Sequence, residues 1–163
     1  MDIRKIYEYA LQREYEGKRF FETNASRMSH ATAVAVFKQL AAEEQKHIEF
    51  VQAQLNAMDA GQTADLAFGQ ELNRSGVFSQ RAAAEFIDQS IIEAMVPDLP
   101  ILRMAYLIER DFTEFYEQAA QKADGQVREV LETLATWERR HAALFKKMHD
   151  QAFDEYAAMP WGG

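Results

Sequence analysis

The sequence of 163 residues contains no cysteine. This absence excludes disulfide bonds, thiolate zinc sites, cysteine-ligated iron–sulfur or rubredoxin-type centres, and catalysis by a thiol. Any metal ion that the chain binds must therefore be held by oxygen and nitrogen atoms.

Glycine and proline are also scarce, with seven and three residues respectively. Alanine, glutamate, glutamine, leucine and methionine recur instead, and these residues favour helix over sheet. The length suits one domain with a sizeable core. We expect an all-α domain over residues 1–158, followed by a flexible C-terminal tail at 159–163, where Pro160 and two glycines cannot continue a helix.

The chain lacks an apolar run long enough to cross a membrane, and residues 1–16 carry charges throughout, unlike a signal peptide. Basic residues are outnumbered by acidic ones, which leaves a formal net charge of −8. This charge argues against nucleic acid or an anionic membrane as a partner. We therefore expect a cytoplasmic protein that binds neither nucleic acid nor membranes.

Apolar residues recur at helical spacing in four long segments, at about 2–24, 30–60, 100–122 and 126–155. Short loops join the first segment to the second and the third to the fourth, so each pair should form an antiparallel hairpin. The connection between the pairs shows no sustained period at 61–78 and predicts a shorter helix at 79–95. Such a connection can return the chain along the whole bundle. The sequence thus predicts a left-handed four-helix bundle with one long crossover that carries a short extra helix.

The two hairpins carry glutamate and histidine residues at matching positions. These residues are Glu14 and Glu109, which align at a shift of 95 residues, and Glu44, His47, Glu138 and His141, which align at a shift of 94. The one-residue difference falls in the hairpin loops, where a duplicated hairpin tolerates an insertion. Two copies related by a pseudo-two-fold axis would bring all six residues to one place.

All six residues interrupt the apolar stripe of their helix. Positions i and i+3 of a helix point the same way, so each Glu-x-x-His pair aims a carboxylate and an imidazole at one spot. Buried carboxylates are costly unless their charge is balanced, and two divalent cations balance four of them. We expect Glu14 and Glu109 to lie between the two ions, with one Glu-x-x-His pair serving each ion. Oxygen donors with one imidazole per metal suit iron or manganese.

This ligand pattern resembles that of the rubrerythrin family in the ferritin-like superfamily, from residue 2 to about residue 155. The resemblance implies a ferritin-like bundle with a non-haem di-iron centre, in which manganese or zinc can substitute for the two iron ions. It also implies an oxidoreductase that reduces hydrogen peroxide or dioxygen at a carboxylate-bridged metal pair, with a role in oxidative stress. Ferritin-like bundles usually associate, so we expect a homo-oligomer, a dimer or larger.

The sequence departs from the family in two respects. Rubrerythrin carries a rubredoxin domain with a cysteine-ligated iron, so this chain resembles a form without that domain and would need a separate electron-donor protein. Rubrerythrin also has a further glutamate one turn after the glutamate of its third helix, where this chain has Phe112. Because that glutamate is tied to peroxide chemistry, the alternative is a ferritin-like iron-binding or storage protein with ferroxidase activity.

A third hypothesis is a structural helical protein without metal, in which the Glu-x-x-His pairs only stabilise their own helices. His30 and His149 fall outside the repeated pattern, and we expect them at the surface. We expect Tyr116 to be a core residue rather than a metal ligand, with a hydrogen bond to a ligand as the alternative.

Overall fold

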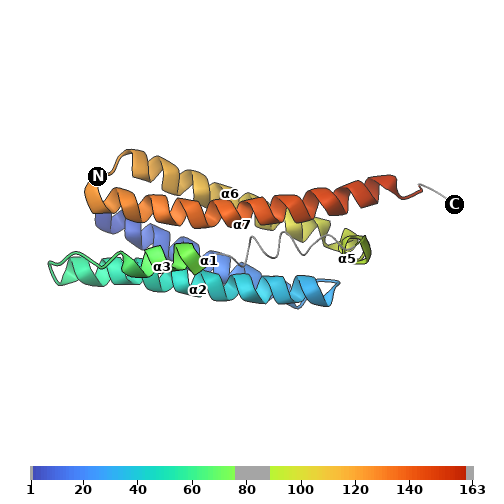
Figure 1. Ribbon diagram of the computed structural model, residues 1–163, viewed down its shortest axis with the longest axis horizontal. Coiled ribbons are helices and arrows are strands. Elements are labelled where there is room, and N and C mark those ends of the chain that lie inside the picture. Colours follow the sequence, from blue (N-terminus) through green and yellow to red (C-terminus); the bar gives the residue numbers. More distant parts are fainter. Residues whose placement is uncertain (1, 76–88, 161–163) are drawn as a thin grey trace.

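The computed structural model describes residues 2–75 and 89–160. Its four long helices are α1 (Ile3–Ala25), α2 (Ala31–Asp59), α6 (Leu99–Gln121) and α7 (Gly125–Ala158). Helices α1 and α2 form one antiparallel hairpin, α6 and α7 form the other, and the two hairpins lie against each other along their length (Figure 1). The all-α, ferritin-like bundle predicted from the sequence is thereby confirmed. Within the described ranges, no helix combines the length and the apolar composition needed to span a membrane.

Local sequence signals set the ends of these helices. The Asp2 side chain caps α1 by accepting a hydrogen bond of 3.2 Å from the Lys5 N–H. Pro100 lies in the first turn of α6, where its missing N–H is not needed. Gly61 follows α2 with φ +65°, and Gly125 opens α7 with φ +54°. These left-handed values are readily adopted by glycine alone.

The crossover joins the end of α2 to the start of α6 and contains α3 (Ala67–Ser75), α5 (Gln89–Ala94) and the 3-10 helix η1 (Val96–Asp98). In Figure 1, α3 lies along α2, whereas α5 lies at the end of the bundle where α2 begins. The Asp98 carboxylate accepts hydrogen bonds from the Ser29 N–H at 3.0 Å and the Ser29 hydroxyl at 2.9 Å. The end of the crossover is thus tied to the loop of the first hairpin.

Helix α3 corrects the prediction for residues 61–78, which showed no helical period in the sequence. It has only nine residues, too few for a clear repeat. It also packs very closely, because a Cβ atom on Gly69 would lie 2.6 Å from Cε2 of Phe50. Most of the helix expected at 79–95 lies outside the described residues, and α5 occupies its last part. Helix α7 ends at Ala158, and residues 161–163 of the expected tail also lie outside the described part.

Two hydrophobic clusters fill the bundle on either side of a polar layer. The first contains Phe21, Phe37 and Phe145, whose ring centroids lie 5.4–5.7 Å apart. The second contains Phe50 and Trp137, with ring centroids 5.2 Å apart. On each long helix, the polar residues of the middle layer lie between residues of these two clusters. The clusters therefore shield this layer from water at both ends.

Candidate metal centre

Six side chains of the polar layer converge from all four long helices. They are Glu14 on α1, Glu44 and His47 on α2, Glu109 on α6, and Glu138 and His141 on α7. All six are buried, and none is more than 4% exposed. The structure thus brings together every residue that the sequence predicted as a metal ligand.

The six side chains form two overlapping groups of potential ligands. These groups are Glu14, Glu44, His47 and Glu138, and Glu44, Glu109, Glu138 and His141. Within each group, one oxygen or nitrogen atom per residue lies within 4.8 Å of the others. Each group can therefore hold one cation, and the two groups share two carboxylates.

The shared residues are the glutamates of the two Glu-x-x-His motifs. Glu44 lies between the imidazoles, with its oxygens 3.3 Å from Nδ1 of His47 and 3.1 Å from Nδ1 of His141. Glu138 also lies between the imidazoles, with its oxygens 3.1 Å from Nδ1 of His47 and 3.5 Å from Nδ1 of His141. These two glutamates are therefore common to both ligand groups.

The two single glutamates belong to one group each, whereas the sequence analysis expected them to lie between the two ions. Glu14 lies 3.2 Å from Nδ1 of His47, and Glu109 lies 3.6 Å from Nδ1 of His141. Helical spacing shows that all these side chains face the bundle axis. It does not show which carboxylates reach across that axis, because the reach depends on rotamers and on the distance between helices.

Most of the carboxylate oxygens in this layer have no hydrogen-bond partner. In the described part of the chain, these buried atoms include both oxygens of Glu44, Glu109 and Glu138, together with Nδ1 of His141. A buried polar atom without a partner costs about 1–3 kcal/mol, so such atoms are rare in folded proteins. Bound cations would satisfy these atoms together, and the donor set therefore fits a metal pair.

Burial and mutual repulsion divide the four carboxyl groups into two kinds. Burial, followed by the negative charge of Glu138, raises the pKa of Glu14 and of Glu109 well above the ordinary value of 4.5. Burial also acts to raise the pKa of Glu44 and of Glu138, but the nearby imidazoles outweigh it and the pKa of both is lowered. The single pair therefore holds its protons more tightly than the shared pair does.

The pKa values of both histidines in the layer are also raised. Burial acts to lower the pKa of His47, but the charges of Glu44 and Glu138 raise it well above the ordinary value of 6.5. Burial is likewise outweighed at His141, where the nearby carboxylates, Glu109 and Glu138 first, raise the pKa well above 6.5. The carboxylates of the layer therefore favour the protonated form of both imidazoles in the absence of metal.

Tyr116 is a fully buried residue that contacts this layer. Its hydroxyl donates a hydrogen bond to Oε1 of Glu14. Of the two roles considered from the sequence, Tyr116 therefore combines core packing with a hydrogen bond to a predicted ligand. Burial, together with the neighbouring carboxyl group of Glu14, raises the pKa of Tyr116 well above 10.0, so the phenol remains a donor.

Substituting Tyr116→Phe should lower the free energy of unfolding of the metal-free protein by about 1–3 kcal/mol, because it leaves a buried carboxyl oxygen without its donor. Urea unfolding followed by circular dichroism measures this change. Tyr15→Phe provides the matched control, since Tyr15 is 53% exposed. Equal midpoints for the two variants would show that the hydrogen bond to Glu14 contributes nothing.

Glu43 contacts the predicted ligand His141, and the sequence analysis missed this contact. Its Oε2 lies 2.9 Å from Nε2 of His141, and its side chain is 14% exposed. Adjacency to Glu44 was its only signal in the sequence. The repeat did not reveal it, because the aligned position in the second hairpin holds Trp137.

Phe112 occupies the position where rubrerythrin has its further glutamate. A Cβ atom on Gly17 would lie 3.3 Å from Cε2 of Phe112 and 3.5 Å from Oε2 of Glu44. The absence of a side chain at Gly17 thus allows the aromatic ring and the shared carboxylate to approach α1 closely. An apolar ring therefore stands beside the polar layer in place of a seventh carboxylate.

The two remaining histidines contribute nothing to this layer. Nδ1 of His30 accepts a hydrogen bond of 3.1 Å from the Thr32 N–H and caps α2. His149 stacks on Phe153 near the end of α7, with ring centroids 6.1 Å apart. Neither residue belongs to the two ligand groups.

Comparison with known proteins supports the predicted family. The Rubrerythrin family model matches residues 100–160, a range that covers nearly all of α6 and α7 and includes Glu109, Glu138 and His141. No curated protein and no solved structure matches the chain significantly. The first hairpin lies outside the matched range, but it repeats the glutamates and the histidine of the second. The family match and the all-helical bundle together confirm the predicted resemblance to the rubrerythrin family of ferritin-like proteins.

Proposed function

We propose that the chain binds a pair of iron ions at these six residues and reduces hydrogen peroxide or dioxygen there. The observation that carries this proposal is the set of four buried carboxylates and two imidazoles that form two ligand groups with two shared members. Two divalent ions would balance the charge of four ionised carboxylates. When bound, a ferrous pair supplies two electrons together, which with two protons convert one peroxide molecule into two water molecules.

The chain's own residues would place and shield this pair. Glu44 and Glu138 would help to hold both ions, and each of the single glutamates would help to hold one. Each imidazole faces the carboxylates through its Nδ1 atom. Tyr116 fixes one oxygen of Glu14 by donating a hydrogen bond, and the two hydrophobic clusters exclude water at both ends of the layer.

One observation favours a second function. Phe112 supplies an apolar ring where rubrerythrin has a further glutamate, and the family's peroxide chemistry is tied to that glutamate. An iron-binding or storage protein that oxidises ferrous iron with dioxygen needs no seventh carboxylate. Phe112 therefore supports a ferroxidase as the alternative to a peroxidase.

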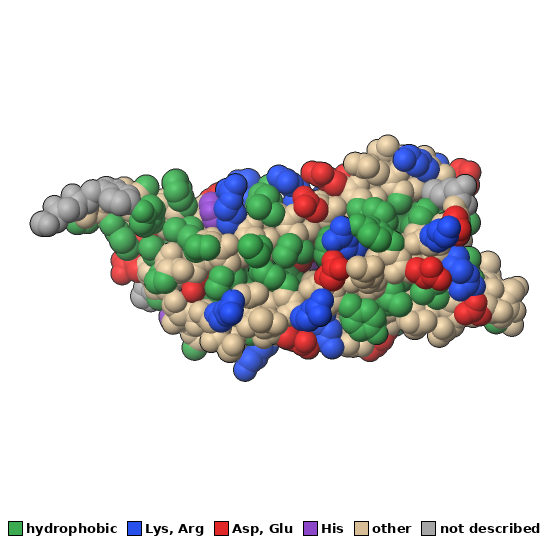
Figure 2. All heavy atoms as spheres, turned by 180° about the vertical axis from the view of Figure 1, so that it is seen from behind, with side chains coloured by type: hydrophobic (Ala, Val, Ile, Leu, Met, Phe, Trp, Pro, Cys, Tyr) green, Lys and Arg blue, Asp and Glu red, His purple; other side chains and the backbone are tan. Residues whose placement is uncertain are grey.

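The proposal includes an electron-donor protein and a homo-oligomer. A peroxidase cycle needs a reductant, and a chain without cysteine has no cysteine-ligated redox centre to provide one. Figure 2 shows hydrophobic side chains lying between charged ones on one face, and exposed large hydrophobic residues include Tyr9, Tyr15 and Met104 on α1 and α6. A face of this kind is suited to association between copies. Light scattering of the purified protein would measure the oligomeric state.

Iron loading followed by oxidation tests the proposed function. Protein loaded with ferrous iron without oxygen should contain about two iron ions per chain, because there are two ligand groups. Stopped-flow absorbance then compares oxidation by peroxide with oxidation by dioxygen. We expect peroxide to react faster if the chain is a peroxidase, whereas faster reaction with dioxygen and uptake of iron far beyond two ions would show a storage protein. A chain that binds no iron would contradict both functions and leave the structural role.

A further inference from the structure

The two halves of the metal site have different surroundings. The shift of 94 residues that aligns the two Glu-x-x-His motifs also aligns Glu43 with Trp137. Glu43 contacts His141, and Trp137 contacts His47. The duplicated site thus has a carboxylate beside one imidazole and an indole ring beside the other.

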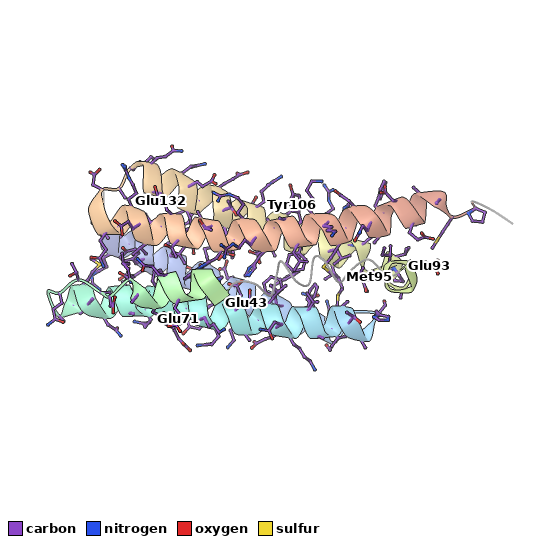
Figure 3. The ribbon with its side chains drawn as sticks, viewed as in Figure 1. Glu43, Glu71, Glu93, Met95, Tyr106 and Glu132 are labelled. Atoms are coloured by element: carbon purple, nitrogen blue, oxygen red, sulfur yellow. The ribbon has the colours of Figure 1, made fainter. Side chains whose placement is uncertain are left out.

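Glu43 fixes the orientation of His141. The side chain of Glu43 projects from α2 towards α7 (Figure 3), and its Oε2 lies 2.9 Å from Nε2 of His141. A carboxylate oxygen accepts hydrogen bonds, so at this distance Nε2 carries the hydrogen and donates it. This leaves Nδ1 as the nitrogen for a metal, and Nδ1 lies 3.1 Å from Oε1 of Glu44 with no hydrogen-bond partner of its own.

His47 is held in a different way. Its ring stacks on Trp137, with centroids 4.5 Å apart and planes 16° apart. Its Nδ1 lies 3.2 Å from Oε2 of Glu14 in hydrogen-bonding geometry. A metal ion can bind this nitrogen only after the hydrogen bond to Glu14 is given up. Trp137 also adds no charge, whereas Glu43 adds a negative charge beside the other half.

We infer that Glu43 is a positioning residue that makes the two metal positions unequal. The position formed by Glu44, Glu109, Glu138 and His141 binds its ion more tightly and fills first, and the position that contains His47 fills second. This inference rests on the proposed metal pair, but it concerns the order and the strength of binding. A carboxylate that orients a histidine ligand typically changes metal affinity about 10–100-fold.

Calorimetric titration of the metal-free protein with cobalt(II) tests this inference without any reaction. His47→Ala leaves the position that contains His141, and His141→Ala leaves the other position. Glu43→Gln should weaken cobalt binding about 10–100-fold in the His47→Ala background, and it should have almost no effect in the His141→Ala background. Glu49→Gln is the matched control, because Glu49 is an exposed glutamate on the same helix, and it should change neither affinity.

Each outcome separates this inference from the proposed function. Equal effects of Glu43→Gln in both backgrounds, or no effect in either, would overturn the inference, even if the wild-type protein still binds two cobalt ions. Failure of the wild-type protein to bind cobalt, iron or manganese would overturn the proposed function and the inference together. Melting curves of the metal-free variants show whether Glu43 has only a structural role. In that case Glu43→Gln would lower the melting temperature equally in the His47→Ala and the His141→Ala background. If an alanine variant fails to fold, the corresponding glutamine variant serves the same comparison.

Discussion

Replacing Glu44 and Glu138 together with alanine should abolish binding of both iron ions while the helical bundle remains folded. These two residues belong to both ligand groups, so their removal leaves each group with one carboxylate and one imidazole. Two donors hold a divalent ion far more weakly than four. Elemental analysis after anaerobic loading and desalting should give about two irons per chain for the wild-type protein and essentially none for the double variant.

The control uses two other glutamates on the same helices. Glu49 on α2 and Glu132 on α7 are exposed and belong to neither ligand group. The double variant Glu49→Ala with Glu132→Ala should keep both irons. Two irons per chain in the variant that lacks Glu44 and Glu138 would contradict the assigned site.

Thermal unfolding adds a second measurement to the same pair of variants. A ligand that binds only the folded state stabilises it by about 2.7 kcal/mol when its free concentration is a hundred times its dissociation constant. Iron should therefore raise the unfolding midpoint of the wild-type protein and of the control. It should leave the midpoint of the variant that lacks the shared glutamates unchanged.

The sequence was sufficient to predict the fold and the membership of the site. Apolar periodicity placed the long helices, and Glu14 and Glu109 were recognisable because both interrupt an apolar stripe at matching positions of a repeat. Burial of a carboxylate is costly, so two such interruptions at equivalent positions require a common reason. That reasoning needs only the spacing along each helix.

The roles within the site could not be predicted, because they depend on distances between helices. Glu44 and Glu138 each lie within 3.5 Å of both imidazoles, a shared position that the sequence analysis had expected for the single glutamates. Glu43 directly precedes the predicted ligand Glu44 in the sequence. Its side chain nevertheless contacts a residue of another helix, His141 on α7. Helix α3 was missed because it is short and packs through Gly69, a residue that usually argues against a helix.

The second large effect is a release of protons when metal binds. The raised pKa values of Glu14 and Glu109 and of both histidines favour the protonated forms of these groups when no metal is bound. Four ionised carboxylates and two neutral imidazoles are needed to bind the metal pair. Binding of two ions should therefore release up to four protons, two from carboxyl groups and two from imidazoles.

Metal affinity should accordingly rise steeply with pH, by about tenfold per pH unit for each proton released. Calorimetry in two buffers of different ionisation enthalpy counts the released protons, and titrations at several pH values give the slope. We expect the number of released protons to fall as the pH rises and the groups lose their protons without metal. Binding that releases no protons would show that the carboxylates are already ionised in the metal-free protein.

The same pKa shifts predict how the stability of the metal-free protein depends on pH. The raised pKa values of His47 and His141 stabilise the fold fully below pH 6.5, and this contribution is lost as the pH rises through their values in the folded state. Glu14 and Glu109 act in the same direction from pH 4.5 upwards. The lowered pKa values of the two shared glutamates act oppositely, since their contribution is present above pH 4.5 and is lost as the pH falls below it.

These contributions add up to a stability that falls as the pH rises above 4.5 for the metal-free protein, because the unfolded chain releases protons that the folded core retains. The metal-loaded protein should not show this fall, since its carboxylates and imidazoles are already deprotonated and its affinity for metal rises with pH. Urea unfolding with and without metal across this range measures both curves. The variant that lacks Glu44 and Glu138 should show a smaller fall, because the charges that hold the histidine protons are gone. Four protons and two divalent ions are thus alternative ways to neutralise the same four carboxylates, and pH decides between them.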